Sequence, residues 1–308
     1  MYLFKNDKRS NLQPIKEQKI PLEKDMQNVV ENNLEEIFGF DFVSSEFTVD
    51  NFRIDTFAYN PDTNSFIVIE YKKDRSFSVV DQWYTYLSLL MNNQAEFILE
   101  YNQKKNKSLN KKDINREATR VFFVANSFNK YQKQAINFKD LPIELWECRK
   151  FEDNIYSFDK IRANNSNISI KNLWGEIASS EVVDNIKTYS VRDHIREDRE
   201  KSKSLYEEFN EKVLSLDNRI EESPQKIYIW YKIWTKVVCG LNIHKNKIKL
   251  GLNRVKPEDL KDPEWRVEYK ENSYRFYNKH LSHFEIHSSE DIDYAIFLIK
   301  QVISKTID

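Results

Sequence analysis

The sequence has little of what several large classes of protein require. It contains two cysteines and four glycines in 308 residues. With so few glycines, and with neither a phosphate-binding loop nor a dinucleotide motif, it does not indicate dependence on ATP or NAD. No apolar run approaches the roughly 18 residues that cross a bilayer, so we expect no membrane span. The N-terminal residues lack the apolar core and cleavage site of a secretory signal, which predicts a cytoplasmic protein.

The positions of the cysteines and the balance of charge narrow further the classes of protein to which the chain can belong. Cys148 and Cys239 lie far apart, without a nearby thiol or a metal-type spacing, so we expect both to be buried and reduced. The 48 Lys and Arg residues balance 49 Asp and Glu residues, and neither half of the chain is polybasic. Any contact with nucleic acid must therefore come from local patches. The 40% of hydrophobic residues is enough to fill the cores of two ordinary domains.

Alternating helix and strand patterns in residues 1–160 predict an α/β domain. Apolar residues at helical spacing indicate a helix over residues 22–38, which Gly39 ends. Residues 47–59 and 66–72 have the composition of strands, and the turn residues between them predict a β-hairpin. The other predicted elements are helices over residues 78–91 and 131–138, strands over residues 95–101, 120–125 and 141–147, and a lysine-rich loop over residues 104–112.

A second, smaller domain of the α+β type is predicted over residues 189–308. A polar break of asparagine and serine at residues 164–167 places a linker over residues 161–188. The predicted elements after it are a charged helix over residues 191–216, antiparallel strands over residues 227–233 and 237–252, and a last helix that begins near Ser289.

The predicted hairpin brings together residues whose chemistry suits a metal ion. Side chains alternate along a strand, so Glu70 and Lys72 lie on the same face. If the hairpin closes at Asn60 and Ser65, its register places Asp55 opposite Glu70, with Cβ atoms within about 4.5–5.5 Å. Two carboxylates this close repel unless a cation lies between them, and Mg²⁺ prefers a few carboxylates with water and phosphate oxygens. Lys72 could orient or activate a water molecule beside them.

A plainer interpretation of these three residues is an Asp–Lys–Glu pairing on a solvated face of a sheet. The spacing of the residues alone does not separate the two interpretations. The hairpin favours the metal site, because its turn residues independently supply the loop length that pairing of Asp55 with Glu70 requires.

Three segments resemble the PD-(D/E)XK nuclease superfamily and follow one another in the order found there. The resemblance covers residues 20–155 and is closest to nuclease-like proteins distantly related to NucS endonucleases. It implies a restriction-endonuclease-like domain with a mixed sheet flanked by helices. One departure is Asn51-Phe52, where a glycine often precedes the first segment, and this bears on how substrate approaches. The segments are Arg53-Ile54-Asp55, Ile69-Glu70-Tyr71-Lys72 and Gln82-Trp83-Tyr84-Thr85-Tyr86.

The resemblance also implies roles for individual residues. In the superfamily, the residues that match Asp55 and Glu70 hold Mg²⁺ (or Mn²⁺), and the residue that matches Lys72 acts in catalysis. RecB-like members add a Gln-x-x-x-Tyr on the next helix, which Gln82 and Tyr86 match. These two residues share one helix face, where they could contact a substrate phosphate or steady Lys72. Ordinary packing on the helix surface remains the alternative for Gln82 and Tyr86.

Further candidates complete the site that the resemblance implies. Members of the superfamily often place a glutamate of the first helix near the metal, which makes Glu23 and Glu31 candidate ligands. Glu23 ranks first because it continues the apolar stripe of its helix, although a first-turn glutamate also favours the helix dipole. The Tyr71 carbonyl is a candidate third ligand. Lys73 and Arg75 are candidates for contact with nucleic acid.

The second domain resembles an uncharacterised domain, sometimes labelled a predicted transport protein, that follows such nuclease-like domains. The resemblance implies no known chemistry. His280, His283 and His287 lie near one another in the sequence, but no cysteine or carboxylate arrangement completes a metal site with them. The segments that resemble this domain are Leu205-Tyr206, residues 214–216 and residues 226–232.

Basic and aromatic residues alternate on one face of a predicted strand in the second domain. Lys226, Tyr228, Trp230 and Lys232 share this face. Such a face could stack bases and contact phosphates. The alternative is that the helix over residues 191–216 covers it.

Two functions therefore remain open. The first is a Mg²⁺-dependent nuclease that hydrolyses phosphodiester bonds of DNA or RNA, with DNA favoured. The second is a non-catalytic module that keeps the nuclease fold and binds nucleic acid or protein, which the near-neutral charge would suit. The sequence leaves a homodimer open.

Overall fold

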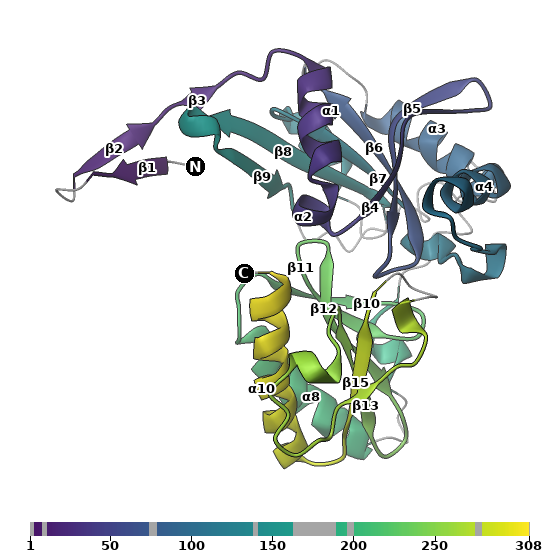
Figure 1. The fold of residues 1–308 in the computed structure, drawn as a ribbon, viewed down its shortest axis with the longest axis vertical. Helices are drawn as coiled ribbons and strands as arrows, with labels where there is room; N and C mark the ends of the chain where they lie inside the picture. Colours follow the sequence, from purple (N-terminus) through teal and green to yellow (C-terminus); the bar gives the residue numbers. More distant parts are fainter. Residues whose placement is uncertain are drawn as a thin grey trace. The chain divides into compact units, whose positions relative to one another are not determined.

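The structure is a computed structural model that describes residues 3–7, 11–73, 79–137, 141–162, 189–195, 200–274 and 279–307, with the side chains of residues 79–81 left out. Contacts divide the chain into two units, Met1–Lys187 and Thr188–Asp308. Each unit has a sheet and a hydrophobic core of its own (Figure 1). The predicted linker over residues 161–188 lies outside the described residues except for its first two.

The first unit is built on a mixed sheet of seven strands. They are β3 (Glu17–Gln18), β4 (Asp41–Val49), β5 (Phe52–Asn60), β6 (Ser65–Lys72), β7 (Arg120–Ala125), β8 (Ile143–Phe151) and β9 (Tyr156–Lys160). Their order is β3-β8-β7-β6-β5-β4, with β9 also paired to β8. The β6–β7 and β7–β8 pairs are parallel, and the others are antiparallel. A separate hairpin of β1 (Leu3–Asn6) and β2 (Leu12–Ile15) extends from this unit (Figure 1).

Helices flank this sheet on both faces. α1 (Glu23–Asn32) and α2 (Leu34–Phe38) share a core with Ile67, Ile69 and Tyr71 of β6. α3 (Val79–Asn92) and α4 (Gln94–Lys105) share the other core with Phe66 and Val68, and α5 (Lys130–Ala135) packs against α3. The two sets of β6 residues alternate along the strand, as the pleat requires. The predicted mixed sheet flanked by helices is therefore confirmed.

Residues 95–101, predicted as a strand, belong to helix α4. Phe97 and Tyr101 lie four residues apart and are both buried in the core beneath the helix. A short apolar run does not by itself distinguish a strand from a buried helix, and here the helical spacing of the two aromatic rings decides. The lysine-rich stretch consequently begins inside α4, which includes Lys104 and Lys105.

The predicted strand over residues 47–59 is two strands, β4 and β5. Asp50 and Asn51 separate them with φ values of 48° and 66°. Positive φ at both central residues is the type I′ geometry that closes two-residue hairpins. The pair lacks the glycine that usually marks this turn in a sequence. The predicted helix over residues 22–38 is also divided, because Asn33 with φ of −129° separates α1 from α2.

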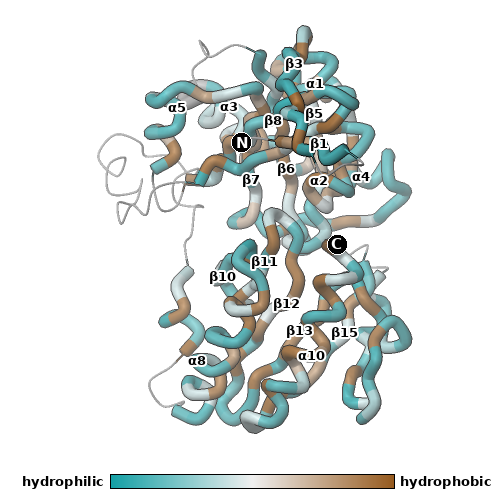
Figure 2. The backbone as a smooth tube through the Cα atoms, turned by 90° about the vertical axis from the view of Figure 1, so that its left-hand side faces the viewer, coloured by the Kyte–Doolittle hydropathy of each residue, from teal (hydrophilic) through white to brown (hydrophobic). Residues whose placement is uncertain are grey.

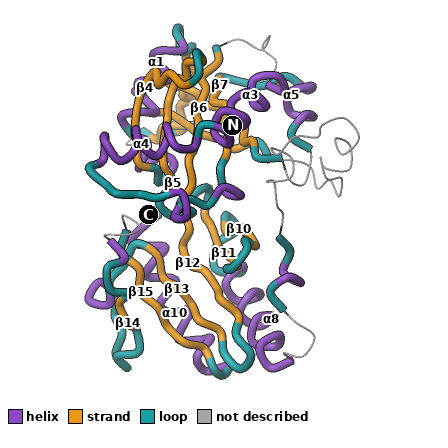
Figure 3. Tube along the Cα trace, turned by 90° about the vertical axis from the view of Figure 1, so that its right-hand side faces the viewer, coloured by secondary structure: helices purple, strands orange, loops and turns teal. Residues whose placement is uncertain are grey.

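The second unit has an antiparallel sheet of six strands. They are β10 (Ile220–Pro224), β11 (Ile229–Ile233), β12 (Lys236–Ile243), β13 (Ile248–Asn253), β14 (Glu268–Tyr269) and β15 (Leu281–Ile286), in the order β10-β11-β12-β13-β15-β14. Figure 3 shows β12, β13 and β15 side by side. Hydrophobic residues recur along β12 and β13 (Figure 2), where the inward side chains enter the core. The predicted antiparallel strands are confirmed.

Two long helices pack on this sheet, α8 (Glu200–Leu214) and α10 (Ser289–Thr306). The last helix begins at Ser289 as predicted. The helix predicted over residues 191–216 is shorter, because Ser190 and Asp193 close a short 3₁₀ turn at its predicted start. The 3₁₀ turns of the described residues are Lys111–Asp113, Arg116–Ala118, Glu152–Asn154, Val191–Asp193 and Pro257–Asp259.

Both cysteines are buried free thiols, as the sequence predicts. Cys148 lies in the core under α1 and α2, and Cys239 lies in the core of the second unit. Burial raises the pKa of the Cys148 thiol to about 12, and it also raises the pKa of Cys239. Thiolate is therefore scarce at neutral pH, and neither cysteine has the reactivity of a catalytic nucleophile.

Gly39 ends α2 in the left-handed conformation, with φ of 69° and its N–H bonded to the Glu35 carbonyl at 2.7 Å. Because a side chain strains this conformation, we expect Gly39→Ala to lower the free energy of unfolding of the first unit by about 1 kcal/mol in urea. Asn106 ends α4 with φ of 51°, so Asn106→Gly is the opposite change and should not destabilise. Equal losses in both variants would contradict this account.

Candidate functional site

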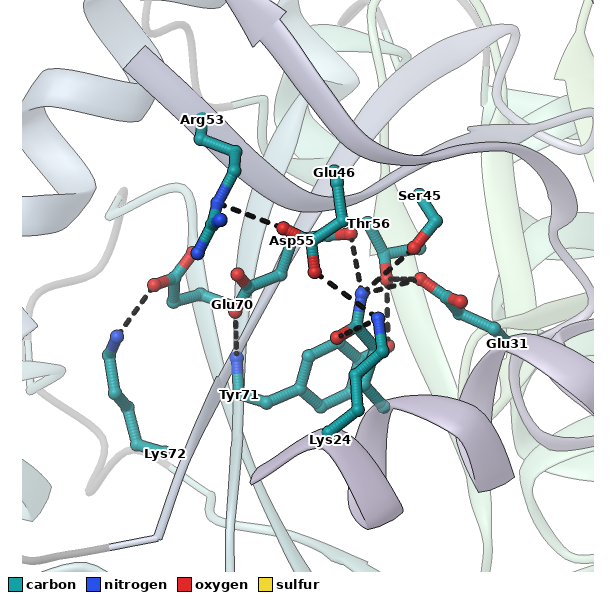
Figure 4. Close-up of polar contacts among 11 residues, drawn as sticks. Lys24, Glu31, Ser45, Glu46, Arg53, Asp55, Thr56, Glu70, Tyr71 and Lys72 are labelled. Atoms are coloured by element: carbon teal, nitrogen blue, oxygen red, sulfur yellow. Dashed lines mark hydrogen bonds and ion pairs between the residues drawn. The ribbon is translucent and has the colours of Figure 1, made fainter. Parts of the chain in front are cut away.

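Asp55 and Glu70 lie at the same end of neighbouring antiparallel strands. The β5–β6 ladder pairs Asn60 with Ser65 and runs to Thr56 and Ile69. This is the predicted register, and Asp55 and Glu70 are the next residues in it. Glu70 lies on the same face of β6 as Phe66 and Val68, which face α3, and Figure 4 shows the Asp55 and Glu70 side chains on adjacent strands. The hairpin therefore brings both carboxyl groups to one end of one face.

The turn that sets this register is held by its own side chains. The Asn60 side-chain oxygen accepts from the backbone N–H of Asp62 at 2.9 Å and of Thr63 at 3.3 Å. The hydroxyls of Thr63 and Ser65 lie 2.5 Å apart, and Asn64 has φ of 52°. These are the local contacts by which Asn, Thr and Ser favour a turn. They fix which residues of the two strands face each other.

Glu70 carries a buried carboxyl group with one oxygen bonded and one not. Its exposed fraction is 4%, and Lys72 Nζ donates to Oε1 at 2.6 Å. Its Oε2 is buried and has no hydrogen-bond partner among the described residues. Burial raises the pKa of Glu70, and the Asp55 charge raises it further against the opposing effects of Lys72 and Tyr86. A buried acceptor without a partner is costly, so this oxygen is where a cation would be stabilised.

Asp55 is the second acid of the site and is partly buried. Its Oδ2 accepts the backbone N–H of Tyr71 at 3.1 Å, which ties the carboxyl group to β6 (Figure 4). Burial raises the pKa of Asp55, while the Tyr71 N–H and the Lys72 charge oppose that rise. The charges of Glu46 and Glu23 raise the Asp55 pKa as well. The site is thus acidic, and Lys72 is the cation that offsets both central carboxylates.

Helix α3 presents Gln82 and Tyr86 to the same end of the sheet. Tyr86 is 8% exposed and lies in the core beneath α3, and its hydroxyl group acts to lower the pKa of Glu70. Burial and the charge of Glu70 raise the pKa of Tyr86, so the phenol stays protonated and donates. The side-chain oxygen of Gln82 is buried without a partner in the described part of the chain. The Tyr86 side chain and the Gln82 oxygen are therefore both buried, on the helix face that the two residues share.

The two candidate glutamates of α1 have different surroundings. Glu23 Oε1 accepts the backbone N–H of Lys73 at 2.8 Å, and its charge acts on Asp55. Glu31 Oε1 accepts from the Thr56 hydroxyl at 2.5 Å and from the Gln27 amide at 2.9 Å. Glu31 is thus engaged by structural partners, whereas Glu23 lies beside the residues that follow Lys72. Lys73 is exposed, and Arg75 lies outside the described residues.

The structure places three further charged residues, Glu46, Arg53 and Lys24, near the site. Glu46 has φ of 55°, and the β4–β5 ladder skips the position where it would pair with Asp55. Its carboxyl group pairs with Arg53 at 2.8 Å and with Lys24 at 3.2 Å (Figure 4). Arg53 belongs to the segment that resembles the nuclease superfamily, so its neighbourhood could have been anticipated. Glu46 could not, because nothing in the sequence separates β4 from β5.

The candidate residues of the second unit lie on β11 and just before it. Ile229, Tyr231 and Ile233 point into the core with α8 and α10, so Trp230 and Lys232 alternate to the opposite face. The expectation that the helix after residue 191 covers this opposite face is wrong, because α8 packs on the inward residues. Lys226 and Tyr228 are exposed.

The three histidines of the second unit each have a partner of their own. His283 pairs with Glu268 at 2.8 Å, and His287 pairs with Glu285 at 3.3 Å. His280 Nδ1 lies 2.9 Å from the Tyr269 hydroxyl. Among the described residues no three His, Cys, Asp or Glu side chains form a cluster that could hold a metal by themselves. Within the same residues, no helix is both long and apolar enough to cross a membrane.

Comparison with known proteins gives one close relative and two distant structures. Residues 191–301 match the family described as "Domain of unknown function (DUF5655)". A Haemophilus influenzae protein described as "Uncharacterized protein" is 37% identical over 297 residues, which cover 96% of this chain and 97% of that protein. The solved structures are a repair endonuclease from Pyrococcus abyssi and an EndoMS–dsDNA complex.

Both structural similarities are partial. The Pyrococcus abyssi endonuclease is 18% identical with a TM-score of 0.25, over 43% of this chain and 50% of its own. The EndoMS complex is 13% identical with a TM-score of 0.25, over 47% of this chain and 65% of its own. The chain therefore spans half of the first structure and less than two thirds of the second. At these TM-scores neither similarity assigns a function.

The raised pKa values of Asp55 and Glu70 predict how the metal-free protein responds to pH. Each folded-state pKa lies above its ordinary value, so the folded state binds protons more tightly, and stability falls as pH rises through that interval. We expect Asp55→Asn to reduce this slope and to raise the free energy of unfolding at neutral pH by about 1 kcal/mol. Urea unfolding in EDTA across pH measures it, with the exposed Glu36→Gln as control. A destabilised Asp55→Asn would contradict the repulsion.

Proposed function

This chain belongs to the same family as the Haemophilus influenzae protein, and we propose that it is a metal-dependent nuclease that hydrolyses phosphodiester bonds. The observation that supports the proposal most is the buried Oε2 of Glu70, which lacks a partner within the described residues and lies beside a second, partly buried acid. Leaving such a group without a partner destabilises the fold. A bound divalent cation would remove that cost.

The donor set fits Mg²⁺ (or Mn²⁺). Asp55 and Glu70 offer carboxylate oxygens, and the Tyr71 carbonyl is a candidate third ligand. Mg²⁺ is commonly bound through one or two carboxylates together with water and substrate phosphates, so a cluster of three acidic or histidine ligands is not needed. Such an ion, when bound, would polarise a phosphoryl oxygen and lower the pKa of bound water. Glu23 is the candidate for a more distant contact, and Glu31 is the weaker one.

Lys72 is the residue proposed to act on the attacking water. Its ammonium group is 2.6 Å from Glu70 and its side chain is 18% exposed, so the group is held in place yet open to solvent. A lysine beside two carboxylates can position a water molecule and stabilise charge on a phosphoryl oxygen. The Tyr86 hydroxyl favours the charged form of Glu70, and the Gln82 oxygen, which has no partner among the described residues, can accept from that water or from Lys72.

DNA is the proposed substrate in preference to RNA, because the sequence segments resemble enzymes related to NucS endonucleases. Lys73 is exposed next to the site and is proposed, together with Arg75, to contact the phosphate backbone. The homodimer stays a prediction.

A non-catalytic binding module is the second candidate. The observation that favours it is the Lys72–Glu70 ion pair, which partly neutralises the site without a metal. Calorimetric titration with Mg²⁺ separates the two proposals. The nuclease site should bind the ion and lose binding in Glu70→Gln, whereas a degenerate site should show no binding in either protein.

We expect the purified protein to cleave DNA with Mg²⁺ or Mn²⁺, and Asp55→Ala or Lys72→Ala to reduce the rate by at least about a hundredfold. Single-stranded, duplex and branched substrates should all be screened. Circular dichroism establishes that the variants fold, and Glu36→Gln and Lys104→Ala are matched controls for charge. Full activity in Lys72→Ala would refute its proposed role, and no cleavage by the wild-type protein would refute the nuclease.

Tyr86→Phe should shift the pH dependence of Mg²⁺ binding. The Tyr86 hydroxyl stabilises the charged form of Glu70, so its loss raises the Glu70 pKa further. The ion binds the deprotonated carboxylate, so affinity should fall at higher pH in the variant than in the wild-type protein. Calorimetry across pH measures this shift. Tyr84→Phe, on the same helix, is the control, and identical profiles for all three proteins would show that Tyr86 does not act on Glu70.

A further inference from the structure

The sheet of the second unit has one face turned to its helices and one turned away. Helices α8 and α10 share a core with Ile229, Tyr231 and Ile233. Tyr228, Trp230 and Lys232 alternate with these residues and so belong to the outward face. Tyr228 is 38% exposed and Trp230 is partly exposed. Two large aromatic side chains therefore contact solvent on the face of the sheet that the two helices do not cover.

Strand pairing places two glycines beside Trp230 on the outward face. Trp230 pairs with Gly240, Gly240 with Gly251, and Gly251 with His283. A Cβ on Gly240 would lie 2.9 Å from Cδ1 of the Trp230 indole, so the absence of a side chain there gives the ring its place. A Cβ on Gly251 would meet only the Gly240 carbonyl oxygen, at 3.7 Å. The surface over Gly251 is thus open, with the indole on one side and the His283 ring on the other.

Lysines lie beside the aromatic rings of this surface, and the carboxylates of the neighbouring strands have basic neighbours. Lys232 Nζ lies 5.3 Å from the centroid of the Trp230 ring. Lys249 is two residues from Gly251 on β13 and points to the same face. Glu285 is bonded by Lys247 at 2.7 Å, and Glu268 pairs with His283. Glu221 lies opposite Lys232 on the β10–β11 pair, and Glu285 lies opposite Lys249 on the β13–β15 pair. Basic side chains therefore offset the carboxylates of this face, and the Lys232 ammonium group lies beside the Trp230 ring.

We propose that this outward face binds single-stranded nucleic acid. A base lies over Gly251 beside the Trp230 indole, and phosphates contact Lys232 and Lys249. Base stacking on aromatic side chains combined with basic groups along the backbone is how single strands are held without sequence preference. A duplex fits this face less well because its bases are already stacked on one another. A helical peptide fits less well because such a segment needs an apolar groove, whereas the centre of this face offers glycine, asparagine and lysine.

This proposal goes beyond the nuclease and does not depend on it. The full chain is titrated against a fluorescein-labelled oligothymidylate of about 20 nucleotides in EDTA, and fluorescence anisotropy gives the Kd. Trp230→Ala should raise Kd about tenfold, the effect of one lost stacked base. Gly251→Val should weaken binding similarly by filling the floor, while its thermal unfolding temperature stays equal or rises because valine suits a strand. Trp265→Ala is the control, since Trp265 is 91% exposed and lies outside the strands.

An oligonucleotide of the same length without bases should bind about tenfold more weakly than oligothymidylate. Equal affinity for the two probes, wild-type affinity in both variants, or binding of duplex alone would overturn the proposal. Hydrolysis of bis(p-nitrophenyl) phosphate by the wild-type protein reports the nuclease centre separately. If the wild-type protein hydrolyses that ester while every variant binds alike, the binding face alone is refuted. If the variants lose binding while the wild-type protein hydrolyses nothing, the nuclease alone is refuted.

Discussion

The candidate site depends on an electrostatic conflict that the fold does not resolve by itself. Glu70 is buried and Asp55 is partly buried, the pKa values of both are raised, and Lys72 offsets their charges. Burying like charges together opposes folding, so the rest of the hairpin must supply the stability. Phe57 and Val68, just inside the two acids, lie in the core beneath α3 and α4 and provide it. The apolar core thus stabilises the end of the β5–β6 hairpin that carries the two acids.

The parts of this site that the sequence predicts are those fixed by local rules. Consecutive turn-forming residues predict the turn between β5 and β6. Strand alternation then assigns Glu70 and Lys72 to one face. Helical spacing likewise assigns Gln82 and Tyr86 to one side of α3. Glu46 escapes such reasoning because its neighbours come from another strand, which Asp50 and Asn51 separate without a glycine signal. Helix α4 was predicted as a strand because the apolar residues of so short a segment fit the strand period as well as the helical period.

The balanced charge of the chain conceals two different local chemistries. The first unit gathers carboxylates at the end of its hairpin, while the second places lysines among aromatic rings on an open sheet face. Summed over the chain, they give a formal net charge of −1. Whole-chain charge therefore says little about a partner that contacts only a few side chains. The face of β11 was predictable from alternation, but which face the helices cover was not.

The turn at the far end of the β5–β6 hairpin sets the register that places Asp55 opposite Glu70. It lies about 17 Å from Asp55, the length of five extended residues. The β5–β6 pairing is continuous over that distance. Inserting or deleting one residue between Asn60 and Ser65 would therefore change which residue faces Glu70. The geometry of the site therefore depends more on the number of residues in this loop than on which residues they are. A buried turn at the opposite end of the hairpin, distant from both carboxylates, thus decides whether they meet.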